Sequence, residues 1–168
     1  AAPCFGNVYK LVEIDGEAVL KRSEDKIKLI NPGRQITYRI MIDDPSKGEI
    51  FKVDVTCLRG DELSRKIENG EEFTVCDEFD RYKSKTFEAG NYQAFVLQKK
   101  VIENGVNIAP TYTLAEKKAF CHDALMHFSP SERRLINPHY YKVDISDDLY
   151  NLKMSIITRL TQEIKNFR

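Results

Sequence analysis

The sequence predicts an α+β fold in which a mostly antiparallel β portion packs with a C-terminal helical group. Two observations predict it. Residues 1–112 carry short runs of alternating apolar and polar side chains that end at turn dipeptides, whereas residues 113–168 carry helix-capping signals and helical spacing. No linker rich in glycine, serine or proline separates these two portions, so we expect them to pack together.

Alternation and turns define the strands of the first portion. Turn-forming residues bound the strands that we expect near 8–14, 34–43, 51–55, 73–76 and 92–102. Asp15-Gly16 and Asn104-Gly105 are dipeptides typical of tight hairpin turns, and a short return strand is predicted after each. A sheet of this kind has exposed edges, which another part of the protein normally covers.

Two longer helices are predicted in the second portion, with a short turn of helix between them that starts at Ser129-Pro130 and ends before Asn137-Pro138. Thr113 and Glu116 form a capping box that opens a helix extending to about His127. Ser146 and the acidic residues after it start another helix and complement its dipole. The apolar residues of that helix form one stripe, which by default packs against the core: Leu149, Leu152, Ile156, Leu160, Ile164 and Phe167.

Charge and length narrow the classes of function. The 168 residues include 26 Lys and Arg and 26 Asp and Glu, so the formal net charge is zero. Nucleic-acid binders usually need a basic excess for phosphate contacts, so we expect no nucleic-acid partner. No apolar run approaches a membrane span and no signal peptide opens the chain, so we expect no membrane partner and a cytoplasmic location. Residue 1 is Ala, which fits a processed N-terminus or a piece of a longer chain.

Cysteine and histidine show no motif of a metal or nucleophile site. The cysteines lie far apart with no CxxC pair, so we expect no zinc site and predict reduced, buried thiols at Cys4, Cys57, Cys76 and Cys121. The histidines lack the i, i+4 spacing of a helical zinc pair, and no nucleophile elbow is present. We therefore predict no catalytic residue and no metal ligand, and expect structural or surface roles for His122, His127 and His139.

The uneven distribution of charge is the strongest local signal for binding. Residues 21–39 contain six basic and two acidic side chains, a local charge of +4 in a neutral chain. Such a basic loop can bind phosphate oxygens through side-chain charge, although ordinary solvated lysines give the same pattern. Residues 68–80 carry six acids and no base, which is typical of a solvated acidic face. Glycine-rich phosphate-binding motifs are absent.

Several segments, in order and in register, resemble the C-terminal part of nicotinate phosphoribosyltransferase. Near the start these are VYKLVEIDG at 8–16, LKRSED at 20–25 and PGRQITYR at 32–39. Near the end they are Leu114 to Glu116, SERRLINPH at 131–139, Tyr141 to Val143 and Ser146 to Leu152. Lys26 and Gln35 depart from the family pattern, which has proline and lysine there, and the match is weak between about 60 and 105.

The resemblance implies that the chain is a C-terminal fragment of such an enzyme and is catalytically incomplete. The complete enzyme would condense nicotinate with phosphoribosyl pyrophosphate to nicotinate mononucleotide, assisted by ATP and Mg²⁺, as a homodimer. The fold implied is a fragment of an irregular α/β-barrel phosphoribosyltransferase, with the first strand of residues 1–112 belonging to the barrel. The partner of the fragment would be the remainder of the parent chain.

The same resemblance places three basic side chains near phosphate groups. Lys10, Lys21 and Arg34 correspond to cations that face the phosphates of ATP or pyrophosphate, where they would offset negative charge in the transition state. The alternative hypothesis is a stand-alone β-rich module that binds a phosphorylated ligand or an acidic partner through residues 21–39. Strong dependence of ligand binding on salt would favour that module.

Overall fold

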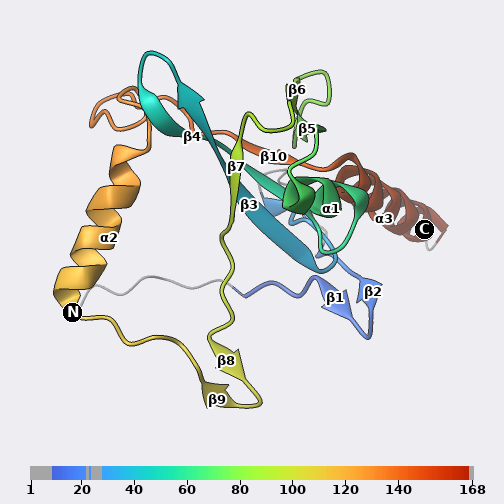
Figure 1. Cartoon of the computed structure of the whole chain (residues 1–168). Helices are drawn as coiled ribbons and strands as arrows, with labels where there is room; N and C mark the ends of the chain where they lie inside the picture. Colours follow the sequence, from blue (N-terminus) through green and yellow to red (C-terminus); the bar gives the residue numbers. More distant parts are fainter. Residues whose placement is uncertain (1–8, 22, 24–27, 167–168) are drawn as a thin grey trace.

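The computed structural model describes residues 9–21, 23 and 28–166 and is built on one six-stranded sheet (Figure 1). Its strands, in spatial order, are β6 (Ser84–Phe87), β5 (Phe73–Asp77), β10 (Val143–Ile145), β4 (Gly48–Leu58), β3 (Gln35–Asp44) and β7 (Gln93–Val96). Two small hairpins lie outside this sheet, β1 (Glu13–Ile14) with β2 (Glu17–Ala18) and β8 (Ile102–Glu103) with β9 (Val106–Asn107). The helices are α1 (Glu62–Asn69), α2 (Leu114–Met126) and α3 (Asp147–Asn166).

The architecture confirms the α+β class and corrects the strand directions. The sheet is mixed, because β10 runs parallel to β4 while it pairs with β5 in the antiparallel sense. The other ladders of the sheet are antiparallel, as predicted. The described strands form an open sheet with β6 and β7 at its edges, and they close no barrel among themselves.

One face of the sheet, the core face, packs against α1. Its buried residues form a single apolar cluster made of Ile36, Tyr38, Ile40, Val53, Val55, Cys57, Leu63, Ile67, Phe73, Val75 and Phe87. Burying a side chain of this size stabilises the fold by about 2 kcal/mol. Asp61 caps α1 by accepting from the backbone N–H of Ser64 at 2.7 Å, and Gly70 ends the helix in the left-handed conformation.

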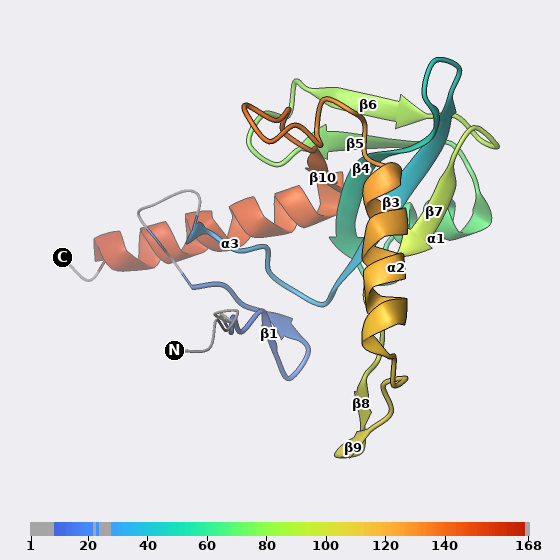
Figure 2. The ribbon, with the colours of Figure 1, turned by 90° about the vertical axis from the view of Figure 1, so that its left-hand side faces the viewer.

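The opposite face, the open face, is covered only in part. At one end the start of α3 buries Leu149 against Cys76 and Ile145, and α3 then extends away from the sheet (Figure 2). Elsewhere on this face, Phe95 of β7 and Val143 of β10 keep 45% of their surface exposed. This face therefore presents apolar side chains to its surroundings.

Several predicted elements differ in length from those observed. The strand predicted at 8–14 is reduced to β1, and the strand predicted at 92–102 ends at Val96 as β7. Tyr9 is 98% exposed and residues 9–12 belong to no strand, while Val8, the first residue of that prediction, lies outside the described residues. α1 lies in the portion predicted to be rich in strands, and β10 of the helical portion lies in the middle of the sheet. Residues 1–112 and 113–168 thus share one sheet.

The two longer helices predicted in the second portion are confirmed, whereas the short helix predicted from Ser129-Pro130 is only a turn, in which the carbonyl of Ser129 accepts from the backbone N–H groups of Glu132 and Arg133. Thr113 and Glu116 form the predicted capping box of α2. Ser146 caps α3 by accepting from the backbone N–H of Leu149 at 3.1 Å. Leu149 and Ile156 of the apolar stripe are buried, while Phe167 lies outside the described residues. None of the helices described is long and apolar enough to cross a membrane.

Candidate functional site

An ion pair lies at the centre of the open face. Arg39 of β3 donates from Nε and from one terminal nitrogen to the two carboxylate oxygens of Asp54 on β4, at 2.8 Å each. Their side chains are 22% and 12% exposed, so the pair is largely withdrawn from water. Hydrogen bonding to Asp54 raises the pKa of Arg39. This guanidinium is therefore fully charged and already neutralised, which leaves it little capacity to bind an added phosphate.

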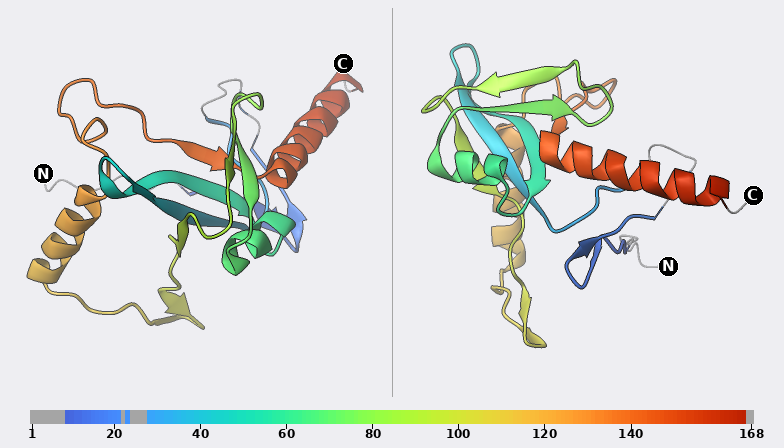
Figure 3. Two further views of the ribbon diagram at one scale, coloured as in Figure 1. Left: turned by 45° about the horizontal axis from the view of Figure 1, so that its top comes forward. Right: turned by 90° about the vertical axis from the view of Figure 1, so that its right-hand side faces the viewer.

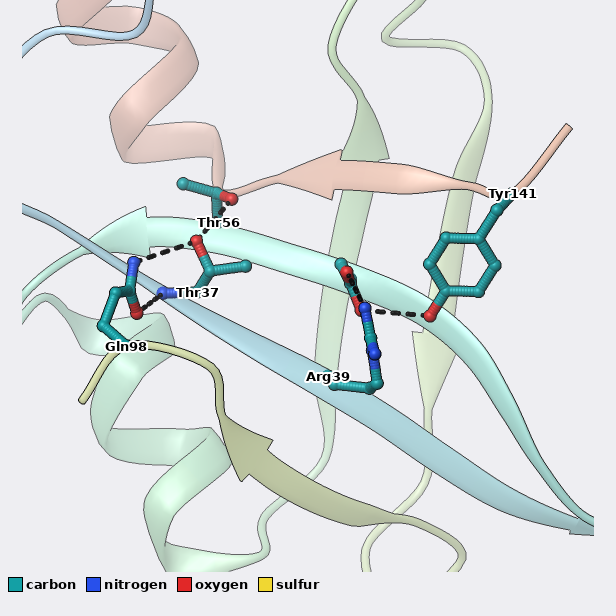
Figure 4. A network of polar contacts seen from close by, with 6 residues as sticks. Thr37, Arg39, Thr56, Gln98 and Tyr141 are labelled. Atoms are coloured by element: carbon teal, nitrogen blue, oxygen red, sulfur yellow. Dashed lines mark hydrogen bonds and ion pairs between the residues drawn. The ribbon is translucent and has the colours of Figure 1, made fainter. Parts of the chain in front are cut away.

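Aromatic rings enclose the same guanidinium. Its central carbon lies 4.8 Å from the ring centroid of Phe51, 5.4 Å from that of Phe128 and 5.7 Å from that of Tyr141. Tyr141 also donates its hydroxyl to Asp54 at 3.0 Å (Figure 4). Burial, followed by the charge of Asp54, raises the pKa of Tyr141. Cation–π contacts of this kind favour a rigid cluster that holds Phe128 and Tyr141, the two ends of residues 128–141, on the sheet.

A second polar cluster lies further along the open face (Figure 4). Thr37 and Thr56 share a hydrogen bond between their hydroxyls at 3.0 Å. Gln98 accepts from the backbone N–H of Thr37 at 2.8 Å and donates to its hydroxyl at 3.2 Å. The backbone N–H of Leu97 adds a bond to the carbonyl of Thr37 at 2.9 Å. These contacts extend the β7 edge beyond Val96 and fix the chain where it leaves the sheet.

The two clusters anchor both ends of a segment that we call the arm, residues 99–126. Gln98 holds its beginning on Thr37. At its end, the carbonyl of His127 accepts from the backbone N–H of Phe51 at 2.8 Å, and the two rings stack with centroids 5.1 Å apart. Between these anchors, α2 and the β8–β9 hairpin stand away from the sheet (Figures 1 and 3). The open face thus positions the arm.

The predicted phosphate-binding residues lie at a different place, around a backbone junction. The carbonyl of Val12 accepts from the backbone N–H of Gly33 at 2.7 Å and from that of Val19 at 2.9 Å. Lys10, Lys21 and Arg34 lie one or two residues from these three positions, and all three are exposed. The structure therefore brings the three segments together at Val12, although among the described contacts no bond joins the three side chains to one another.

The rest of the basic stretch is only partly described. Arg22 and Lys26 lie outside the described residues, and Arg39 is neutralised by Asp54. Gln35, which stands where the family has lysine, donates its side-chain amide to the carbonyl of Asn31 at 2.6 Å. Its role is to brace the turn before β3. The local charge of +4 counted from the sequence therefore overstates the charge that this loop can offer a ligand.

The histidines and cysteines behave largely as predicted. His122 and His139 are exposed, and His127 packs on Phe51. Cys57 and Cys76 are buried, but Cys121 on α2 is exposed, so the expectation of buried thiols is wrong for that residue. Cys4 lies outside the described residues. No group of three or more His, Cys, Asp or Glu in the described part of the chain is arranged to hold a metal ion.

A hollow of about 500 Å³ lies on the core-face side, between β3 and the chain that links β6 to β7. Asp43, Glu49 and Glu88 line it together with a single cation, Lys85. Burial and the neighbouring Lys52 lower the pKa of Lys85. Three carboxylates would repel a phosphate group, so we assign no phosphate site there.

The sequence alone did not predict the anchoring residues Asp54, Gln98 and Tyr141. The alternation of residues 34–43 predicts that Arg39 lies on the face opposite Tyr38, but it names no partner for Arg39 across the sheet. Tyr141 carried a signal, because it lies in one of the segments that resemble the family. Gln98 carried no such signal, since polar residues are common beyond the end of a strand.

The mixed sheet, the helix α1 on its core face and the anchored arm define an α+β domain. Its described residues form no metal-binding cluster. A family model described as the nicotinate phosphoribosyltransferase C-terminal domain matches residues 34–153. The chain therefore belongs to the nicotinate phosphoribosyltransferase family and contains the C-terminal domain of that family, as the resemblance predicted.

Named relatives agree with this assignment. Nicotinate phosphoribosyltransferase of Bos taurus is 31% identical over 150 residues, which are 89% of this chain and 26% of that protein. The Homo sapiens enzyme is 29% identical and is matched over 92% of this chain and 27% of its own length. The Bacillus subtilis (strain 168) enzyme is 25% identical, with 97% and 32% covered. The chain thus spans between a quarter and a third of the length of these relatives.

A solved structure supports the fold. The crystal structure of human nicotinic acid phosphoribosyltransferase superposes with a TM-score of 0.67 at 22% sequence identity. The superposition covers 89% of this chain and 26% of the human chain. The six-stranded sheet and its helices therefore belong to a fold that occurs within a larger enzyme.

Proposed function

We propose that the chain is the C-terminal domain of an enzyme that condenses nicotinate with phosphoribosyl pyrophosphate. The products would be nicotinate mononucleotide and pyrophosphate, with ATP hydrolysis assisting, in NAD biosynthesis. The observation that carries the proposal is the family match over residues 34–153, together with relatives that bear the name of this enzyme. In this proposal the parent enzyme contains an irregular α/β barrel, which other parts of the polypeptide complete.

The domain by itself is proposed to be catalytically incomplete. The polar cluster at the centre of its open face, Arg39 with Asp54 and Tyr141, is internally paired. The parent would use Mg²⁺ with its pyrophosphate, and oxygen ligands suit that ion. We assign none of the described residues of this chain to Mg²⁺, since they form no cluster of three potential ligands.

Lys10, Lys21 and Arg34 are proposed to meet the phosphates of ATP or pyrophosphate in the complete enzyme. Their segments converge on the carbonyl of Val12, and all three side chains are exposed and can turn toward a ligand. Once a partner surface excludes water, a cation beside phosphate stabilises developing charge far more than it does in solvent. This convergence supports the assignment beyond the sequence resemblance.

Activity assays test the reaction. The complete polypeptide and the 168-residue chain are each incubated with nicotinate, phosphoribosyl pyrophosphate, ATP and Mg²⁺, and nicotinate mononucleotide is measured by chromatography. We expect product from the complete polypeptide alone. Product from the 168-residue chain would overturn the proposed incompleteness, and no product from either would overturn the proposed reaction.

Substitutions in the complete enzyme test the cations. Lys10→Ala, Lys21→Ala and Arg34→Ala should each reduce ATP-coupled turnover about tenfold to a hundredfold, the loss expected for one desolvated charge-assisted contact. Lys83→Ala is the control, because Lys83 is exposed and paired with Asp80 on the β5–β6 turn. If one of the three variants has the same turnover as Lys83→Ala, the substituted residue does not contact the phosphates.

The assembly and location of the parent are further proposals. We propose a homodimer in the cytoplasm. Sedimentation of the complete enzyme should give twice the mass of one polypeptide, and fractionation of source cells should place the enzyme with cytoplasmic markers. A monomer, or recovery with organelles, would contradict the respective proposal.

A further inference from the structure

The arm, residues 99–126, has regular structure but no core. It contains the β8–β9 hairpin and the four-turn helix α2, which has a complete capping box. None of its side chains is buried, and only Ala109 and Ala124 are half-buried. Large apolar side chains stand in the open, including Ile102 at 64%, Val106 at 62%, Leu114 at 77% and Phe120 at 72%.

Such elements are not stable by themselves in water. A helix of 13 residues is marginal without tertiary packing, and a hairpin of two-residue strands is weaker still. A capping box contributes only about 1 kcal/mol. The apolar residues of α2 are spread around the helix, so no rotation of the helix would bury them all on the domain's own sheet. The arm therefore requires a second surface.

The chemistry of the arm indicates a lasting apolar contact. α2 carries the acids Glu116 and Asp123 and the bases Lys117 and Lys118, so its charges cancel. Its attraction to a partner therefore rests on apolar area, as in obligate interfaces. Both ends of the arm are anchored on the sheet, which fixes where α2 and the hairpin are presented.

We infer that α2 and the β8–β9 hairpin dock onto the remaining part of the same nicotinate phosphoribosyltransferase polypeptide. This inference rests on the proposed function. The matched region covers only 26% of the bovine relative, so about three quarters of such a polypeptide lies outside it. A surface in the same polypeptide is present at an effective concentration of about a millimolar, which a second molecule reaches only when it is already bound.

Photo-cross-linking in the complete enzyme tests the docking. Benzoylphenylalanine replaces Phe120, the enzyme is irradiated, and the products are separated on a denaturing gel and mapped by mass spectrometry. We expect a cross-link within one polypeptide, joining position 120 to a residue outside the 168-residue region. The matched control has benzoylphenylalanine in place of Tyr82, which is 98% exposed on a turn between charged residues. That variant should give at least tenfold less cross-linked product.

Two other outcomes would overturn the inference. A cross-linked species of twice the polypeptide mass would show that a second copy covers α2. A yield at position 120 no higher than at position 82 would show that α2 is not docked in the complete enzyme. The cross-link and the nicotinate assay are independent readouts, so a docked arm in an inactive enzyme would refute the proposed reaction and leave the docking intact.

Discussion

Arg39 and Asp54 lie directly opposite each other on β3 and β4, and two N–H groups of the guanidinium donate to the two carboxylate oxygens at 2.8 Å each. The pair is enclosed by Phe51, Phe128 and Tyr141, which come from β4 and from the chain after the arm. Removing one partner would therefore leave a charge among aromatic rings with no counter-ion. The intact pair keeps Phe128 and Tyr141, the two ends of residues 128–141, on the sheet.

The first prediction concerns this pair. Asp54→Asn should lower the free energy of unfolding of the 168-residue chain by about 3 kcal/mol, because a largely buried guanidinium loses its counter-charge. Arg81→Ala is the control, since the Arg81–Asp147 pair is 43% and 68% exposed and should contribute less than about 1 kcal/mol. Urea unfolding followed by circular dichroism measures both. Equal small losses would show that the pair is not buried in solution.

The Arg39–Asp54 pair also shows why the sequence could not predict the anchor. The β3–β4 turn pairs Asp44 with Gly48, and counting back from this pair would place Arg39 opposite Val53. A β-bulge between Ile40 and Met41 shifts the register by one residue and brings Asp54 opposite Arg39. A shift of one residue reverses which face each side chain occupies. A turn can be predicted from its own few residues, whereas this bulge depends on packing between residues across the sheet.

Other elements that the sequence did not predict differ in how far a local pattern marks them. β10 is three residues long and pairs with β4, far away in the sequence, so no local pattern marks it. In contrast, α1 could have been found, because Asp61 precedes it, Leu63 and Ile67 share one face, and Gly70 follows it. The helices with strong local caps, α2 and α3, were predicted to within about a residue at their starts. The backbone junction at Val12 joins three separate segments and is not a sequence pattern.

The second prediction concerns thiol reactivity. In the Cys4→Ser variant at pH 8, iodoacetamide should label Cys121 and spare the other two thiols by at least about a hundredfold in rate. Cys57 and Cys76 are buried, and burial raises the pKa of both, that of Cys76 to about 11. Mass spectrometry counts the labels, with one expected in buffer and three in urea. Rapid labelling of Cys57 in buffer would contradict the packing of the core face.

The third prediction concerns the junction beside Val12. Gly33 has φ of +80°, and a Cβ built there lies 2.9 Å from Cδ2 of Leu58. Gly33→Ala should therefore cost about 2–3 kcal/mol, part from the left-handed backbone and part from crowding. Gly48→Ala isolates the backbone part, because φ there is +75° and a Cβ meets nothing within 4 Å. Its cost should be about 1 kcal/mol, measured by the same urea titration. Identical losses would mean that Leu58 moves aside freely.

The last prediction concerns alkaline pH and the docking of α1. Tyr38 of β3 is 1% exposed, and its hydroxyl contacts Ser64 and donates to Glu68. Burial, followed by the hydrogen bond to Glu68, raises the pKa of Tyr38 from 10.0 to about 12. A group with a raised pKa in the folded state favours folding fully below its unfolded pKa and loses that contribution as the pH rises. The ionisation of Tyr38 should therefore lower the free energy of unfolding by roughly 2 kcal/mol between pH 10 and 12.

Two variants isolate this effect from the titration of other groups. Tyr38→Phe should lower stability by about 1–2 kcal/mol at pH 8, because Ser64 and Glu68 lose a partner, and its stability should fall less steeply above pH 10 than that of the unmodified chain. Tyr82→Phe should follow the unmodified chain at every pH, since Tyr82 is 98% exposed. Urea unfolding at pH 8, 10 and 11.5 gives the three curves. Parallel curves for Tyr38→Phe and the unmodified chain above pH 10 would show that Tyr38 ionises as readily in the folded state as in the unfolded state, and that α1 does not seal it from water.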